Sequence, residues 1–549
     1  MTRQFIFLVF LMLSSAIFAQ AVPEWLWVNQ SGGAGYETAL STVVDGQGNQ
    51  YVTGFFENTA VFGSSSFQCL GFQDVFVAKF DRSGNCLWAR QAGGEGQDWG
   101  CGIALDINGQ VYITGRYSGT PNFGSYALPA TYQYSTNIFV AKLDPSGNWL
   151  WASWAGGNGW NWGKSIAVMG NGCFVTGSND NMTVFGTHPL NNRGIFVAKL
   201  DLNGSWIWAS GGTCENSLGN AIIADAGGNC YLTGDFRGAA SFWPTPDNGP
   251  MLYLYSNDPE YQDLFVAKTD TNGNWLWAVR AGGLGDSEYN DSGKGIGLDS
   301  AANVYVTGDF VSLADFGPYN LYSPDYTTDA FIAKLDTNGN WLWARRAGGT
   351  GEDRGNGLSV DGAGNCYITG NFQGPADFGS SLLDPGPNLS AIYAARLDSS
   401  GNWSWAVCAV TGDYYSGPLE ANAIANDGAG NCFAVGWFNG TACFGSHNLT
   451  STVTSSDVFI ARLGFRPQSP ANLAISVIGN NVLLTWDPVT VDTGGQPLIP
   501  EAYQVFSDAS GNPEGPFDYL GQTDSTAYIH LNAVVGRDTR FYRVTALKE

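Results

Sequence analysis

The sequence predicts an all-β protein in which seven similar four-stranded sheets close into a ring, followed by a small β-sandwich. Three observations lead to this prediction. One phrase recurs seven times, four short apolar segments accompany each full recurrence, and the first and last copies are incomplete in complementary ways. With 44% hydrophobic and 14% aromatic residues, the chain has the composition of a folded protein rather than a disordered one.

The repeated phrase reads DTNGNWLWA both at Asp270–Ala278 and at Asp336–Ala344. Its first copy, EWLWV from Glu24, lacks everything before the tryptophans. Successive copies lie 57 to 69 residues apart, which is typical of a repeat architecture. The second tryptophan position of each copy is occupied by Trp27, Trp88, Trp151, Trp208, Trp277, Trp343 and Trp405.

Each complete unit contains four predicted strands. In the second unit they are Ile103–Asp106, Val111–Gly115, Ile138–Leu143 and Trp149–Ala155, rich in Val, Ile, Tyr and Trp and bounded by Gly, Asn and Asp. Turns that resemble Asp-x-x-Gly-Asn join the first strand to the second and the third to the fourth, which predicts tight hairpins. The strands are apolar on both faces, so neighbouring units must stack face to face.

The two incomplete copies predict how the stack ends. The chain begins with a lone fourth strand at Glu24–Asn29 and finishes the repeat region with three strands at Ala421–Gly464. An open stack would need polar capping repeats, and the sequence contains none. We therefore expect Glu24–Asn29 to pair with Asp457–Leu463 in a shared seventh sheet, which closes a seven-bladed β-propeller.

Segments such as DVFVAKFDRSGNCLWARQAGGEGQDWGCGIALDINGQVYITG (residues 74–115) resemble the bacterial SBBP repeat, named for a seven-bladed β-propeller. The resemblance extends from about Trp25 to Gly464. It implies a fold and brings no established activity. Two places depart from the pattern: Met169 replaces the turn Asp, and AVTGD from Ala409 replaces AGG.

The sequence outside the repeats suggests export and a second domain. Residues 1–21 contain one Arg, an apolar run from Phe5 and small residues at Ala19 and Ala21, as in a secretory signal peptide. We expect a secreted or cell-surface protein with the propeller at 22–464, a linker at 465–470 and a second domain at 471–549. Through Trp486 and its FYRVTA ending, that domain resembles a fibronectin type III module, which implies a β-sandwich.

Charge and residue content disfavour several functions. A net charge of -24 argues against nucleic acid and anionic membranes as partners, and no later stretch is long and apolar enough for a spanning helix. We expect no metal and no cofactor, because none of the three histidines neighbours Cys or Asp at ligand spacing: His188, His447 and His530. Four cysteines share a repeat position with Val, which predicts small buried side chains rather than disulfides: Cys173, Cys230, Cys366 and Cys432.

Two sets of charged or polar residues recur, and each has two interpretations. A cation on every third strand either packs its stem between sheets beside a carboxylate, or belongs to an anion-binding ring: Lys79, Lys142, Lys199, Lys268, Lys334, Arg396 and Arg462. A residue before the first strand either accepts hydrogen bonds that join neighbouring sheets, or helps to hold a cation: Glu37, Asp98, Asn161, Asp291 and Asp353.

Binding residues are expected where the copies differ. The segments from second to third strand and from fourth strand to the next unit emerge at one end and vary in length and composition. The aromatic residues there either stack on a ligand or wedge against neighbouring sheets. The predicted ligand-binding residues are Tyr36, Trp99, Trp160, Trp162, Tyr289, Tyr414 and Tyr415.

These features favour an exported, non-enzymatic binding or adhesion protein whose variable loop face engages a glycan or an extracellular protein. The second domain would then serve as a spacer or anchor. One alternative is a hydrolase or lyase that acts on polysaccharide through loop carboxylates such as Asp98 and Asp353. Another is a structural cell-surface scaffold, which would self-associate.

Overall fold

The computed structural model describes residues 22–549 except 133, 181, 215, 243–250, 284–289, 380, 388, 413–415, 452–454, 467, 479–480, 495–497, 501, 509–516, 532–540 and 548–549. The predicted signal peptide at 1–21 lies outside the described residues. Apart from one 3-10 turn, η1 (Pro324–Tyr326), all the regular elements described are β-strands. Within these ranges no helix is long and apolar enough to cross a membrane.

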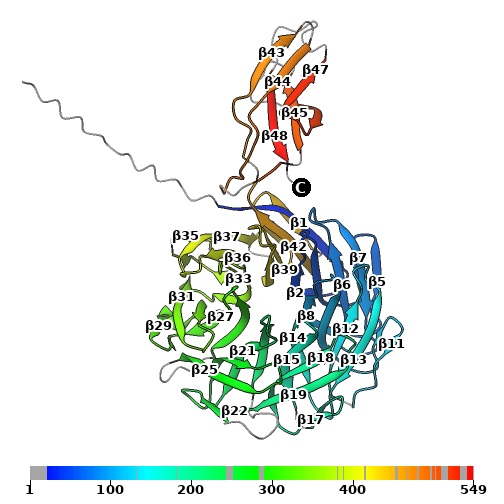
Figure 1. The fold of residues 1–549 in the computed structure, drawn as a ribbon, viewed down its shortest axis with the longest axis vertical. Helices are drawn as coiled ribbons and strands as arrows, with labels where there is room; N and C mark the ends of the chain where they lie inside the picture. The colour runs from blue at the N-terminus through cyan, green and yellow to red at the C-terminus, as the bar shows by residue number, and fades with distance from the viewer. Residues whose placement is uncertain are drawn as a thin grey trace, which may run out of the picture.

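Seven antiparallel sheets share one order of four strands, from the innermost strand outward, and surround a common centre (Figure 1). We number them 1 to 7 along the chain by their innermost strands. The innermost strands are β2 (Glu37–Val44), β8 (Trp99–Leu105), β14 (Trp162–Met169), β20 (Leu218–Ala224), β26 (Ser292–Leu298), β32 (Arg354–Val360) and β38 (Leu419–Asn426). The second strands are β3 (Gln50–Phe56), β9 (Val111–Tyr117), β15 (Gly172–Asn179), β21 (Cys230–Arg237), β27 (Val304–Val311), β33 (Cys366–Gln373) and β39 (Cys432–Asn439).

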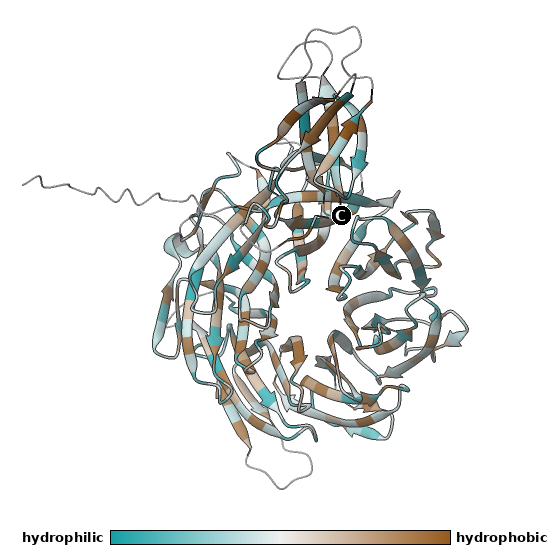
Figure 2. Cartoon of the chain, turned by 45° about the horizontal axis from the view of Figure 1, so that its top comes forward, coloured by the Kyte–Doolittle hydropathy of each residue, from teal (hydrophilic) through white to brown (hydrophobic). Residues whose placement is uncertain are grey.

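The outer half of each sheet comes from the third and fourth strands. The third strands are β6 (Asp74–Phe80), β12 (Asn137–Leu143), β18 (Gly194–Asp201), β24 (Gln262–Thr269), β30 (Thr328–Leu335), β36 (Ser390–Leu397) and β42 (Ser456–Gly464). The outer strands are β7 (Cys86–Ala92), β13 (Trp149–Ala155), β19 (Trp206–Thr213), β25 (Trp275–Gly283), β31 (Trp341–Gly349), β37 (Trp403–Thr411) and, for sheet 7, β1 (Glu24–Gly33). Figure 2 shows the ring turned by 45°, with apolar residues spaced along these strands.

Sheet 7 combines three strands from residues 419–464 with β1, which lies about 400 residues earlier in the sequence, as predicted. β1 pairs antiparallel with β42, from Glu24↔Gly464 to Ser31↔Val458. Trp25 is only 6% exposed, packs edge-on against Phe444 at 5.1 Å, and donates its indole N–H to a main-chain carbonyl of β37. The expected pairing of the orphan strand is confirmed.

The segments between second and third strands differ from the variable loops that the sequence suggested. They contain two-stranded hairpins that lie against the outer strand of the preceding sheet: β4–β5 (Thr59–Phe62, Ser65–Gln68), β10–β11 (Asn122–Phe123, Tyr126–Ala127), β16–β17 (Thr183–Phe185, His188–Leu190), β22–β23 (Ala239–Phe242, Leu252–Tyr255), β28–β29 (Leu313–Phe316, Tyr319–Tyr322), β34–β35 (Ala376–Phe378, Ser381–Leu383) and β40–β41 (Thr441–Phe444, His447–Thr450). The last residues of an outer strand extend past the end of the third strand, so their main-chain N–H and C=O groups have no partner in their own sheet. The hairpin pairs with these residues instead. Part of each segment between the second and third strands therefore serves the packing of neighbouring sheets rather than ligand binding.

The second domain contains two three-stranded sheets. They are β43 (Ala474–Ile478), β44 (Asn481–Thr485) and β47 (Ala527–His530), and β45 (Ala502–Asp508), β46 (Asp518–Thr523) and β48 (Phe541–Leu547). Residues from both sheets and the adjoining segments, including Leu484, Trp486 and Val505, form one buried cluster. This arrangement agrees with a small sandwich, while the fibronectin type III resemblance stays a prediction.

All ten cysteines are free thiols in the structure. The four at the shared repeat position are at most 1% exposed: Cys173, Cys230, Cys366 and Cys432. Their predicted role as small buried side chains is confirmed.

Candidate functional site at the centre of the ring

Each innermost strand has a register shift at the same place, where one residue stands opposite no residue of the second strand. Such a bulge redirects a side chain. The seven residues at these shifts are Leu40, Cys101, Lys164, Asn220, Lys294, Asn356 and Asn422.

On one side of the ring, these bulge residues bond the neighbouring innermost strands together. Asn356 donates to the carbonyl of Ala421 at 3.0 Å, and Asn422 donates to the carbonyl of Ala39 at 2.8 Å. Lys294 forms an ion pair with Asp309 and donates to Asn356 Oδ1 at 3.2 Å. These polar side chains have partners within the protein.

On the other side, sheets 1 to 3 bring aromatic rings and cations together. The Arg116 guanidinium carbon lies 3.8 Å from the ring centroid of Trp99 and 4.6 Å from that of Trp162. Trp99 also stacks on Phe55, with centroids 4.6 Å apart and 14° between the planes. Lys164 Nζ lies 4.0 Å from the Trp162 centroid. We call these five residues the inner aromatic cluster, and all of them are partly exposed.

The two cations of this cluster lie in surroundings that disfavour their charge. Burial lowers the pKa of both Arg116 and Lys164. Arg116 Nε is buried and has no hydrogen-bond partner among the described residues. Next to Lys164, burial raises the pKa of Asp235 to about 6, although Asn220 and Ser292 donate hydrogen bonds to its carboxyl. The arrangement offers partly exposed aromatic rings and cations, with the Asp235 carboxyl in the environment of Lys164.

The predicted ligand-binding residues fall into three groups. Trp99 and Trp162 meet in the inner aromatic cluster. Tyr36 and Trp160 are 53% and 64% exposed and lie outside that cluster. The other three lie outside the described residues: Tyr289, Tyr414 and Tyr415.

Sequence reasoning missed Phe55, Arg116 and Lys164. A signal for the first two was present, because they follow an almost constant Thr-Gly or Val-Gly pair at the end of the second strand. The residues at this position are Phe55, Arg116, Ser178, Asp235, Asp309, Asn371 and Trp437. The residue after this Gly is of six different types in the seven sheets, while the pair before it is almost constant. The fold therefore does not dictate its identity, and such a position is available for binding residues.

The recurring acidic and amide residues before the innermost strands are buried between sheets. Asp98 accepts hydrogen bonds from the main-chain N–H groups of Gly94 at 2.8 Å and Ser118 at 3.3 Å. Asp291 and Asp353 each accept in the same way from the last N–H group of the preceding outer strand and from the last N–H group of the second strand. The loop hydrogen-bond interpretation is confirmed for these three, and the described residues contain no cluster of three or more His, Cys, Asp or Glu that could hold a metal ion.

These buried carboxyls have strongly raised pKa values. Burial raises the pKa of Asp98, Asp291 and Glu37 to about 8, and that of Asp353 to about 7. In each case the charge of a second carboxyl, on the third strand of the preceding sheet, raises the pKa further. Asp98 and Asp353, the carboxylates proposed for an enzyme, thus lie inside contacts between sheets.

The recurring cations of the third strands pack against aromatic rings. Lys142, Lys268 and Lys334 lie 4.6 to 4.8 Å from the centroid of a second-strand tyrosine, and each donates to a main-chain carbonyl of the next sheet. Lys334 also pairs with Asp299 at 3.4 Å. The packing between sheets is confirmed for these three residues, and the expected carboxylate partner is confirmed for Lys334.

Comparison with known proteins supports the repeat assignment. Residues 87–116 and 342–372 match the model of the SBBP family, described as a beta-propeller repeat. The chain contains SBBP repeats. Each matched segment begins within the tryptophan phrase and ends in the second strand of the next sheet, so it crosses a contact between sheets.

Two curated relatives are longer than this SBBP-repeat chain. An uncharacterized WD repeat-containing protein of Acanthamoeba polyphaga mimivirus is 23% identical over 514 residues, covering 75% of this chain and 36% of that protein. Regulatory protein FlaEY of Caulobacter vibrioides is 25% identical over 431 residues, covering 73% of this chain and 43% of that protein. The chain therefore spans less than half the length of either.

Similar solved structures include a protein of unknown function from Bacteroides caccae and a gluconolactonase from Xanthomonas campestris. The first is 9% identical with a TM-score of 0.23, covering 55% of this chain and 88% of that one. The second is 12% identical with a TM-score of 0.27, covering 66% of this chain and 92% of that one.

Proposed function

We propose that the seven SBBP-repeat sheets form a closed seven-bladed β-propeller, and that this propeller serves as an exported, non-enzymatic binding protein. Support for closure comes from the pairing of β1 with β42 and from the contact between the innermost strands of sheets 7 and 1, β38 and β2. The ligand we propose is a glycan, with a segment of an extracellular protein as the alternative.

The inner aromatic cluster is the observation that supports binding best. Partly exposed aromatic rings and cations, with the Asp235 carboxyl in the environment of Lys164, offer apolar contact and hydrogen bonding to a sugar. Arg116 is held by two rings rather than by an acidic partner, and its Nε lacks a hydrogen bond within the described part of the chain. A ligand oxygen would supply the missing acceptor.

The test is a glycan and matrix-protein array with the protein that starts at residue 22, followed by titration of any binder. Trp99→Ala and Arg116→Met should each weaken binding at least about tenfold, because they remove an aromatic contact or a charged donor. Trp160→Ala is the matched control, since Trp160 is exposed but lies outside the cluster. Absence of any ligand tighter than about 1 mM would count against the proposal, as would a loss of affinity in Trp160→Ala alone.

A polysaccharide-acting enzyme and a structural scaffold stay as alternatives. The enzyme would need carboxyls other than Asp98 and Asp353, since both are buried between sheets. Turnover of polysaccharide that disappears in Asp235→Asn would favour the enzyme, because burial raises the pKa of Asp235 to about 6 and its charge interacts with Lys164 of the inner aromatic cluster. Concentration-dependent self-association on a sizing column, without any ligand, would favour the scaffold.

A further inference from the structure

Neighbouring sheets are joined by one repeated hydrogen bond on the face that carries the tight turns. The second tryptophan of the phrase donates its indole N–H to the carbonyl of the second residue in the next sheet's turn. Six tryptophans make this bond, at 2.9 to 3.3 Å: Trp27 to Arg82, Trp88 to Pro145, Trp151 to Leu202, Trp208 to Thr271, Trp277 to Thr337 and Trp343 to Ser399.

The cation of the third strand often shares the same acceptor. Lys142, Lys268 and Lys334 each donate to the carbonyl that also accepts from their sheet's tryptophan, at 3.4 Å. Arg462 of sheet 7 does so at 3.0 Å, to the carbonyl of Arg82. An indole N–H and a cation therefore converge on one carbonyl oxygen at these contacts.

Sheet 6 is the exception. Its donors are Trp405 and Arg396, and their acceptor would come from a turn between the third and fourth strands of sheet 7. Sheet 7 has no such turn, because its fourth strand, β1, comes from the other end of the chain. Trp405 is 3% exposed, and neither its Nε1 nor Arg396 Nε has a hydrogen-bond partner among the residues the structure describes.

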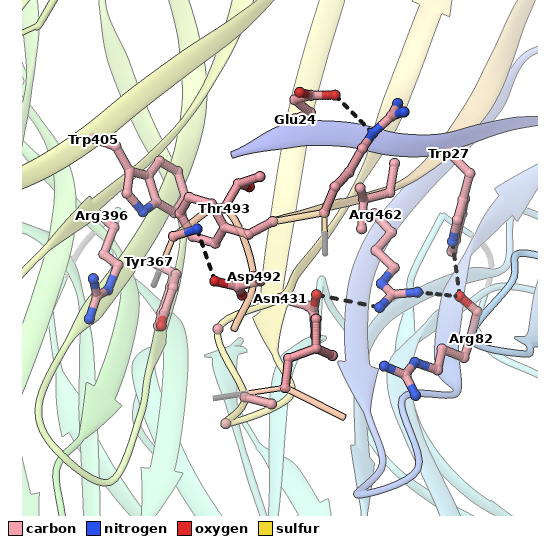
Figure 3. A pocket seen from close by; sticks show the side chains of 18 of the residues that line it. Glu24, Trp27, Arg82, Tyr367, Arg396, Trp405, Asn431, Arg462, Asp492 and Thr493 are labelled. Atoms are coloured by element: carbon pink, nitrogen blue, oxygen red, sulfur yellow. Dashed lines mark hydrogen bonds and ion pairs between the residues drawn. The ribbon is translucent and has the colours of Figure 1, made fainter. Parts of the chain in front are cut away.

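A cleft of about 1140 Å³ occupies the place of the missing turn, between the propeller and the second domain. Figure 3 shows Arg396, Tyr367 and Trp405 together on one side of it, and Arg462, Trp27 and Arg82 on the other. Four of the chain's 24 Lys and Arg residues line this cleft: Arg82, Arg396, Arg462 and Arg466.

The acidic residues of the cleft have other partners. Glu24 pairs with Arg466 at 3.0 Å, and Asp361 accepts the main-chain N–H groups of its own turn. Asp492 accepts the N–H of Gly494 at 2.9 Å. The remaining polar lining is rich in amides and hydroxyls, which suit the hydroxyl groups of a sugar: Ser83, Asn365, Asn431, Ser469 and Thr493.

We propose that this cleft binds an acidic oligosaccharide, with a carboxylate at the acceptor position between Trp405 Nε1 and Arg396. A buried N–H without an acceptor is costly, and a guanidinium beside it favours a charged oxygen over a neutral one. The volume lies above the range of about 300–1,000 Å³ for common ligand pockets, which favours an oligomer over a single sugar. The site lies at the opposite ends of the strands from the inner aromatic cluster, so it does not depend on the function proposed above.

The experiment is calorimetric titration of the protein from residue 22 onward with tetragalacturonate, with the neutral galactose tetramer and with hexaglutamate. We expect tetragalacturonate to bind below about 1 mM and the neutral tetramer to bind at least about tenfold more weakly. Trp405→Phe and Arg396→Gln should each weaken tetragalacturonate binding at least about tenfold.

Trp343→Phe is the matched control, because it removes the equivalent N–H from a contact that is already satisfied. It should leave the affinity unchanged while lowering the melting temperature more than Trp405→Phe does. The inference is overturned if tetragalacturonate does not bind or if Trp405→Phe binds it as the unaltered protein does. Tighter binding of hexaglutamate than of tetragalacturonate would overturn the saccharide assignment.

Discussion

The contacts between sheets contain buried carboxyl pairs, and replacing one pair should change how stability depends on pH. Between sheets 1 and 2, Asp74 and Asp98 both lie against Gly93, where a Cβ atom would clash with both carboxyls. The equivalent contact between sheets 2 and 3 has amides in the same two places, Asn137 and Asn161. The double variant Asp74→Asn/Asp98→Asn therefore copies an arrangement that the protein already contains.

The expected change in the free energy of unfolding follows from the raised pKa of Asp98. Burial, then the charge of Asp74, raises its pKa from the usual 3.8 to about 8. Between these two pH values the native state holds a proton that the unfolded chain has released. The associated stability is fully present below about pH 4 and is lost as the pH rises through 8. One such proton lowers the free energy of unfolding by about 1.4 kcal/mol per pH unit, or about 3 kcal/mol between pH 5 and pH 7.

The assay is urea unfolding at pH 5, 6 and 7, followed by tryptophan fluorescence. Relative to the unaltered protein, the double-Asn variant should lose about 3 kcal/mol less between pH 5 and pH 7. The reciprocal variant, Asn137→Asp/Asn161→Asp, should lose more, because it creates a fifth carboxyl pair. If the double-Asn variant keeps the full pH dependence, the carboxyl pair does not hold the proton and this reasoning is refuted.

Three further predictions concern the same contacts. Gly348→Val should lower stability by about 2–4 kcal/mol in thermal melts at pH 6, since its φ is +150° and a Cβ would clash with Asp329 and Asp353; an unchanged melting temperature would contradict this. Deleting residues 20–33 should abolish the cooperative melt, because it removes the partly buried Trp27 and the buried Trp25, whose loss alone costs about 3–5 kcal/mol, whereas deleting 469–549 should preserve it; the opposite result would mean that β1 is dispensable. Trp343→Phe should cost about 1 kcal/mol more than Trp405→Phe, because within the described residues Trp343 has an acceptor and Trp405 has none; equal costs would argue against an orphaned donor in sheet 6.

The structure also explains a departure that the sequence left unexplained. AVTGD from Ala409 replaces AGG, so Val410 stands where three other sheets have a glycine against two carboxyls: Gly93, Gly282 and Gly348. The two acidic positions of that contact are occupied by Ala391 and Leu419, both fully buried. Loss of the carboxyls makes room for the Val and Leu side chains, and the contact becomes apolar. All three changes belong to one packing unit that is spread over about 30 residues of sequence.

The sequence by itself determined the features that depend on residues within one repeat and that recur from repeat to repeat. The strands, their tight turns and the pairing of Glu24–Asn29 with β42 were all predictable, because local apolar patterns and turn residues recur in seven copies and the incomplete copies complement each other. Such features depend on a few neighbouring residues, so a single sequence displays them directly.

Only the tertiary structure decided where the candidate sites lie. The inner aromatic cluster combines side chains of three sheets, and the hairpins contact strands of a preceding repeat. The cleft beside Trp405 exists because a turn is missing from sheet 7, and its far wall comes from the second domain. The physical reason is the same in each case: these sites depend on contacts between residues far apart in the chain, which local periodicity does not encode.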